Sequence, residues 1–85
     1  MSGPRMKYVT VAGYGEDEIY IFNETLSHQN FCFRMNIDPK DVMTAGFFTV
    51  DPSNGPKFFG KSTTLRKESS PADLIIFKRH CGWDD

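Results

Sequence analysis

The feature that most constrains this chain is a helix-start signal near its C-terminal end. Ser70 suits the N-cap position, and Pro71 suits the first helical position, where its missing N–H costs nothing. Asp73 places a carboxylate at the positive end of the helix dipole. An apolar run follows, and Gly82 is placed to end the helix. The pattern therefore predicts a helix over 71–81.

A dense group of basic residues precedes this helix, and no acidic residue lies among its members. The group is Lys57, Lys61, Arg66 and Lys67. Unpaired N–H groups at a helix start attract anions, and arginine presents a planar fork to phosphate. We therefore predict a seat for a negatively charged ligand, unless these charges are simply a solvated edge.

The predicted seat combines cations, hydroxyl groups and helix amides, with an aromatic ring to stack a base. Its predicted ligand-binding residues are Phe47, Phe58, Lys61, Ser62, Arg66, Lys67, Ser69, Ser70 and Asp73, with His28 as a further donor. Since the formal net charge is only −1, no global field draws the protein to nucleic acid or to a membrane. The expected partner is a small anionic or nucleotide ligand, and nucleic acid is the least favoured partner.

Alternating apolar residues indicate strands in the rest of the chain. The predicted strands are 7–12, 18–22, 42–50 and 57–64, and turn residues occupy 13–17 and 51–55. Residues 26–37 fit either a strand or a helix face, and a short helix capped by Ser27 is favoured. A single turn is expected near residues 38–41.

This order of elements predicts the α+β class, with a four-stranded, mainly antiparallel sheet and one or two helices packed on one face. The chain of 85 residues is expected to form one domain over 7–82, with a disordered N-terminus at 1–6 and a tail at 83–85. Two cysteines are too few for a disulfide framework, so reduced thiols and a cytoplasmic location are expected. No stretch is long enough to cross a bilayer, so a membrane partner is not expected.

Two motifs that could suggest other chemistry lack the context that they need. Residues 55–62 match the phosphate-loop pattern G-x-x-x-x-G-K-S, but Pro56 removes a donor and no helix follows. His28 and Cys32 share a helical face, yet two ligands do not make a closed metal site. No nucleophile and base are paired either, so we predict no cofactor, no metal and no enzymatic activity.

Four short motifs carry a family resemblance over most of residues 18–77. They are Leu26-Ser27-His28, Thr44-Ala45-Gly46-Phe47, Gly60-x-Ser62-x-x-Leu65 and Ser69-Ser70-Pro71-x-Asp73. They resemble the patterns LSH, SAGF, GxSxSL and SRPxD of small phage- and prophage-encoded proteins, which include the Thoeris anti-defence sponges. Ser70 stands where that pattern has arginine, so Arg66 or Lys67 substitutes for it or the ligand differs.

The resemblance implies a non-enzymatic protein that sequesters a cyclic ADP-ribose-type signal in the cytoplasm of a host cell. It also implies a homo-oligomer, a dimer or larger, with nucleotide pockets near subunit boundaries. The alternative interpretation is a protein–protein interaction module that inhibits a host protein through a sheet edge or surplus aromatic residues, of which the eight phenylalanines offer many.

Overall fold

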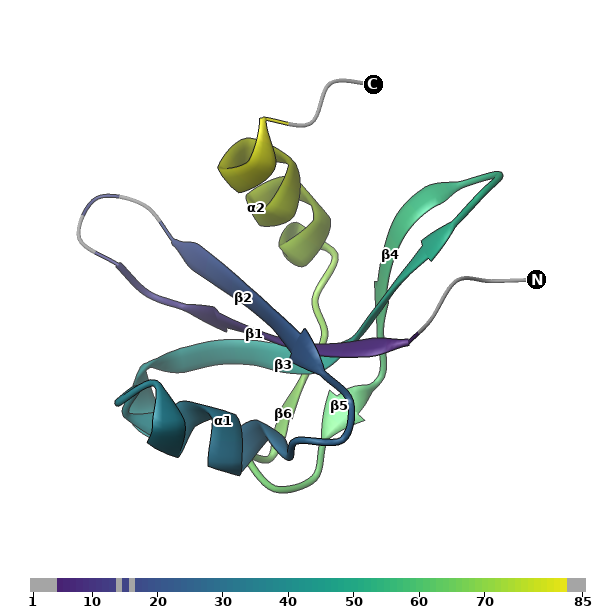
Figure 1. Ribbon diagram of the computed structural model, residues 1–85. Coiled ribbons are helices and arrows are strands. Elements are labelled where there is room, and N and C mark those ends of the chain that lie inside the picture. Colours follow the sequence, from purple (N-terminus) through teal and green to yellow (C-terminus); the bar gives the residue numbers. More distant parts are fainter. Residues whose placement is uncertain (1–4, 14, 16, 83–85) are drawn as a thin grey trace.

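A computed structural model describes residues 5–13, 15 and 17–82. The elements in chain order are β1 (Met6–Val11), β2 (Glu18–Asn23), α1 (His28–Arg34), a 3₁₀ turn at Pro39–Asp41, β3 (Val42–Asp51), β4 (Gly55–Phe59), β5 (Lys61–Ser62), β6 (Lys67–Glu68) and α2 (Ala72–Cys81). Strands β2, β1, β3 and β4 form one antiparallel sheet in that order, and β5 pairs with β6 in a separate ribbon (Figure 1). The predicted α+β class and four-stranded antiparallel sheet are confirmed.

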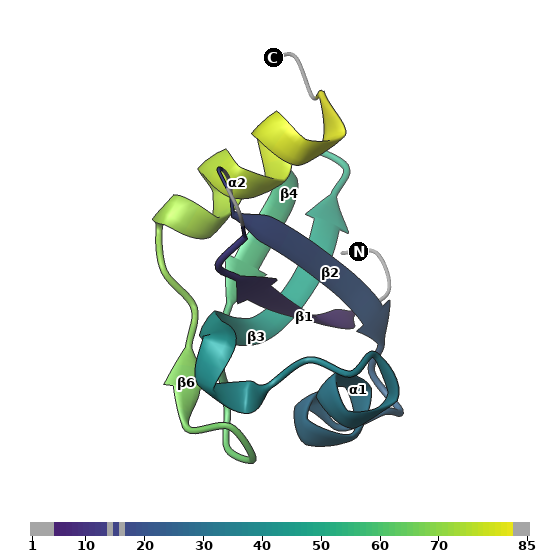
Figure 2. The same ribbon diagram turned by 90° about the vertical axis from the view of Figure 1, so that its left-hand side faces the viewer.

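The two helices lie on opposite faces of the sheet, which corrects the expectation of helices on one face. Adjacent residues of a strand point to opposite faces of the sheet, and β1 carries a buried hydrophobic residue on each face. Val9 belongs to the core cluster that contains Phe31 of α1, whereas Tyr8 belongs to the cluster that contains Phe77 of α2. Both faces therefore need a cover, and Figure 2 shows α2 above the sheet and α1 below it.

Both predicted helix starts form the hydrogen bonds that their sequences suggest. In α1, Ser27 Oγ accepts from the Asn30 amide at 3.0 Å. Helix α2 begins at Ala72, one residue after the predicted start, although Pro71 already has helical dihedral angles and Ser70 Oγ accepts from the Ala72 amide at 3.3 Å. Gly82 ends α2 in the left-handed conformation, with φ of 64°. Capping residues close in sequence thus predict where α1 begins and where α2 begins and ends, to within one residue.

The predicted strand over 57–64 is wrong at both ends, because β4 covers Gly55–Phe59. The sheet strand stops at Gly60, whose φ of 77° turns the chain out of the sheet. The Gly60 carbonyl then accepts from the Ser69 amide at 3.0 Å, which closes the base of the β5–β6 ribbon. A Cβ at residue 60 would lie 2.9 Å from the Phe47 ring, so both the backbone and the packing require glycine here.

The N-terminal boundary also differs from the predicted one. Strand β1 begins at Met6, and the Arg5 guanidinium forms an ion pair with Glu24 at 2.9 Å, although residues 1–6 were expected to be disordered. Residues 1–4 and the predicted tail at 83–85 lie outside the described residues, as do positions 14 and 16 of the predicted first turn. Among the helices described, none is long and apolar enough to cross a membrane.

Candidate functional site

A hollow of about 400 Å³ lies on the β5–β6 ribbon and contains three of the four predicted cations. Its lining residues are Lys61, Ser62, Thr63, Arg66, Lys67 and Glu68. This volume lies within the range of roughly 300–1,000 Å³ that is typical of small-molecule sites. The fourth predicted cation, Lys57, lies on β4 opposite Thr49 and does not line the hollow.

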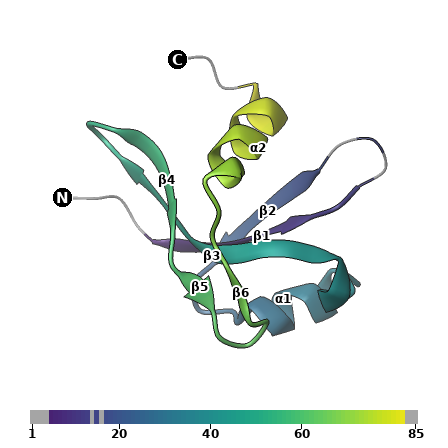
Figure 3. The ribbon, with the colours of Figure 1, turned by 180° about the vertical axis from the view of Figure 1, so that it is seen from behind.

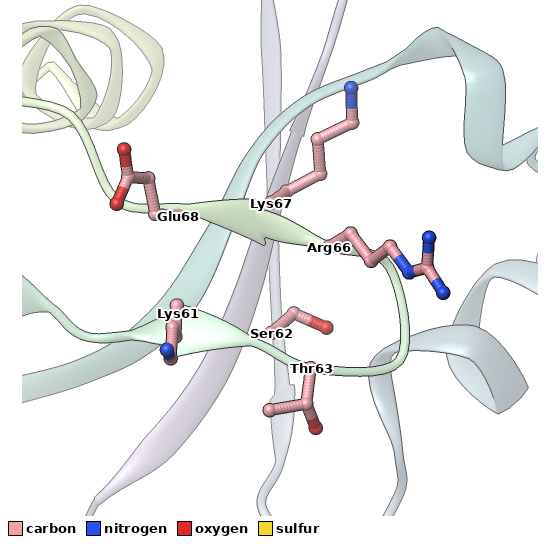
Figure 4. A pocket seen from close by; sticks show the side chains of 6 residues that line it. All are labelled: Lys61, Ser62, Thr63, Arg66, Lys67 and Glu68. Carbon is pink, nitrogen blue, oxygen red and sulfur yellow. The ribbon is translucent and has the colours of Figure 1, made fainter.

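The basic side chains surround the hollow and do not converge on one point. In Figure 4, Arg66 and Lys67 leave the β6 end of the turn in different directions, and Lys61 leaves β5 at the other end of the ribbon. Lys61 is paired in register with Glu68, and Ser62 with Lys67. Since opposed residues share a face in an antiparallel pair, Lys61 and Lys67 start from opposite faces of the ribbon. Such separated charges suit a ligand with more than one anionic group.

The turn of the ribbon is fixed to the core by its own residues. Leu65 packs against the cluster beneath α1, and Ser62 Oγ accepts from the Leu65 amide at 3.2 Å. Ser62 is 2% exposed, so its hydroxyl serves this turn and is only the floor of the hollow. Arg66, by contrast, is exposed and has a φ of 57°, a left-handed conformation that is unfavourable for arginine. The anchored turn therefore presents Arg66 to solvent.

The start of α2 is not part of this hollow, although the sequence suggested that the two would meet. The ribbon extends below the sheet on the side of α1, whereas α2 lies above it, and this is seen both in Figure 1 and from behind in Figure 3. The first amides of α2 are also used within the protein. The Ala72 amide donates to Ser70 Oγ, and the Asp73 amide donates to the Ser70 carbonyl. The predicted joint seat is therefore not assembled.

The Asp73 carboxylate lies in the first turn of α2, on the buried side of the helix. The side chain is 1% exposed, and it accepts from the Tyr8 hydroxyl, from Thr44 Oγ1 at 2.7 Å and from the Ser70 amide at 2.9 Å. Thr44 Oγ1 also contacts Thr10 Oγ1, so the hydrogen-bonded chain continues across β1 and β3. With both of its oxygens engaged, Asp73 is a structural residue in this arrangement, and Ser69 and Ser70 lie beside it instead of in the hollow.

Burial and the Asp73 contact both act on the Tyr8 hydroxyl. Burial is the larger cause of its raised pKa, and the hydrogen bond to Asp73 adds to it. A neutral phenol is therefore the form that the interior holds. No buried side-chain nitrogen or oxygen in the described part of the chain lacks a hydrogen-bond partner. The interior thus presents a complete polar network and no orphaned group directed at a ligand.

The two predicted base-stacking rings lie on opposite faces of the sheet, and neither lines the hollow. Phe47 has Arg5 at 4.6 Å over its ring and Phe59 stacked at 5.8 Å. Phe58 packs edge-on against Tyr8 with ring centroids 4.7 Å apart, and it also contacts Phe48 and Phe77 of the core. These contacts leave both rings only partly exposed.

His28 is a buried structural residue in α1. Its Nε2 lies 2.8 Å from the Gly46 carbonyl oxygen and acts as the donor, because a carbonyl can only accept. Burial lowers the pKa of this imidazole, while the Gly46 bond partly opposes that effect. The resemblance motifs that include His28 and Gly46 therefore meet in space as one contact between α1 and β3.

Two features were missed by the sequence reasoning. Glu68 lines the hollow, which only the pairing register of β5 with β6 could reveal. A second hollow of about 490 Å³ lies between α1 and the 3₁₀ turn, with Phe33 and Ile37 among its lining residues. The Phe33 side chain is 86% exposed, an unusual position for a large apolar ring. The sequence left residues 26–37 open between a strand and a helix, and no role was assigned to the Phe33 ring.

No protein-family model, curated protein or solved structure matches this chain.

Proposed function

We propose that this protein is a non-enzymatic binding protein that sequesters a small phosphorylated ligand of the cyclic-nucleotide type on the β5–β6 ribbon. The carrying observation is the hollow of about 400 Å³ with Lys61, Arg66 and Lys67 around it. Since the formal net charge is only −1, the attraction for an anion is local to this ribbon. The short motifs that resemble those of phage-encoded sponges support the same class, with the host-cell cytoplasm as its proposed place of action.

The positions of the charges favour a particular kind of ligand. Arg66 can engage one phosphate with its planar fork, and Lys61 can reach a second anionic group at the far end of the ribbon. Glu68 repels a third negative charge and accepts from a hydroxyl or amine of the ligand. A cyclic dinucleotide carries two separated phosphates together with hydroxyl and amine groups, and so fits these three groups best. A cyclic ADP-ribose derivative has its two phosphates joined as a diphosphate, which Arg66 alone could engage.

Titration calorimetry with a panel of cyclic dinucleotides, cyclic ADP-ribose derivatives and inorganic phosphate tests this proposal. At least one cyclic ligand should bind at micromolar protein, and the bound ligand should be recovered chemically unchanged. Arg66→Ala should weaken binding by about tenfold, which is about 1.4 kcal/mol. Lys57→Ala is the matched control, because this lysine lies outside the hollow. Absence of heat with every ligand, or equal losses in both variants, would contradict the proposal.

A second candidate function is inhibition of a host protein through the surface of α1. The exposed Phe33 and the half-exposed Met35 beside the hollow of about 490 Å³ favour it, because exposed aromatic and methionine side chains are enriched at interfaces. Affinity capture from a host lysate separates the two functions. Capture that is lost in Phe33→Ser and retained in Arg66→Ala favours the interaction module, and the reverse pattern favours the anion-binding protein.

A further inference from the structure

The two edges of the sheet are protected to different degrees. An edge strand presents unpaired N–H and C=O groups to any other strand, and proline, lysine or a bulge normally blocks such pairing. Edge strand β4 carries Pro56, which has no N–H, and the exposed Lys57. Edge strand β2 has the sequence EIYIFN, without proline, glycine or lysine, and it pairs with β1 in one unbroken register. Edge strand β4 therefore carries two guards within it, whereas β2 carries only the charge of Glu18 at its first position.

The apolar side chains of β2 reach the open edge on both faces of the sheet. Ile19 and Phe22 are buried, each in a different core cluster. Tyr20 and Ile21 are only partly buried, and they pack at the margins of these same two clusters. Figure 2 shows β2 in front of the rest of the sheet, between α2 and α1. An added strand would extend both cores at once.

We propose that β2 pairs antiparallel with β2 of a second copy of this chain, joining the two sheets into one of eight strands. Directly opposed residues of an antiparallel pair share a face. A two-fold axis must therefore place one residue opposite its own copy, and the centre of β2 offers Tyr20 or Ile21. The inference is independent of ligand binding, because the β5–β6 ribbon belongs to neither edge of the sheet.

Charge selects between these two registers. Centred on Ile21, the pairing places Glu18 opposite Glu24 of the other copy, and opposed like charges are destabilising. Centred on Tyr20, it places Glu18 opposite Phe22 and Ile19 opposite Ile21, with no like-charged pair along the strand. The Tyr20-centred register is therefore the one in which no carboxylate of β2 opposes another carboxylate.

Light scattering over a range of protein concentrations tests the proposal. The unmodified protein should have twice the mass of one chain, and Tyr20→Lys should weaken the dimer by at least about tenfold, because two lysines would then face each other. Lys57→Glu on the guarded edge is the control and should leave the dimer unchanged. A strict monomer at all concentrations would overturn the proposal, as would a dimer that Tyr20→Lys leaves intact.

A cysteine cross-link decides the outcome if the lysine variant does not fold. In a Cys81→Ser background, Tyr20→Cys places two thiols directly opposite each other at the two-fold axis, within reach of a disulfide. Mild oxidation should give a covalent dimer, whereas Ser53→Cys in the β3–β4 turn should remain monomeric on a denaturing gel. Equal cross-linking at both positions, or none at position 20, would refute pairing through β2.

Discussion

The β5–β6 ribbon and the start of α2 adjoin in the sequence but behave as opposites in the structure. The ribbon turns Arg66 towards solvent, whereas the helix start encloses Asp73 within hydrogen bonds to Tyr8, Thr44 and Ser70. A helix start binds an external anion only when its own side chains leave the amides free. Here the Asp73 carboxylate and the Ser70 hydroxyl already accept hydrogen bonds from the amides at this helix start. The difference separates a surface that is available for a ligand from one that holds the fold together.

The largest expected effect is at the helix start. Asp73→Ala should lower the free energy of unfolding by about 3 kcal/mol, because it leaves the buried Tyr8 and Thr44 hydroxyls without their acceptor. Urea unfolding followed by circular dichroism measures this loss. Asp73→Asn, which retains size and one acceptor, should lose less. A loss in Asp73→Ala below about 1 kcal/mol would mean that the network contributes little to stability.

A substitution in the ribbon should change the stability of the protein and its affinity for the ligand in opposite directions. Arg66→Gly should raise the free energy of unfolding by about 0.5 kcal/mol, because glycine accepts a φ of 57° without strain and this gain exceeds its extra chain entropy. The same change should weaken ligand binding. Arg66→Ala is the control, since it loses the guanidinium but retains the strained dihedral angle. Equal stability changes in the two variants would show that the backbone at this position is not strained.

The smallest expected effect concerns His28. This residue is a buried structural residue, although the sequence placed it among the predicted ligand residues. Burial lowers its pKa in the folded state, so the unfolded state binds the proton first as the pH falls. This contribution to stability is complete above the ordinary histidine pKa of about 6.5 and decreases as the pH falls below it. Unfolding between pH 7.5 and pH 5 should therefore be less pH-dependent in His28→Gln, whose amide can still donate to the Gly46 carbonyl. Equal slopes would contradict the assigned role.

Short-range signals in the sequence were sufficient for most of the fold. The first hairpin, the α1 cap at Ser27, the turn after Asp51 and the end of α2 at Gly82 each depend on residues a few positions apart. The helix at residues 28–34 was favoured over a strand by an apolar helix face together with the Ser27 cap, and the structure confirms it. Capping and turn chemistry act locally, so they can be predicted without knowledge of the tertiary contacts.

The candidate site was predicted only in part, because its geometry depends on distant contacts. Tyr8 lies 65 positions from Asp73, and nothing local shows that the two meet. The faces of Phe47 and Phe58 depend on strand register, and the separation of the ribbon from β4 depends on Gly60. Lys61, Arg66 and Lys67 line the same hollow because they are close in sequence. The helix amides were not available, because Asp73 and Ser70 occupy that end of α2.

Amide chemical shifts of the labelled protein, recorded while a cyclic nucleotide is added, locate the anion-binding surface residue by residue. We expect this surface on the β5–β6 ribbon and not at the start of α2. The largest shift changes should fall on residues 61–68, with little change at residues 70–74. Changes centred on residues 70–74, or no change with any phosphorylated ligand, would contradict it.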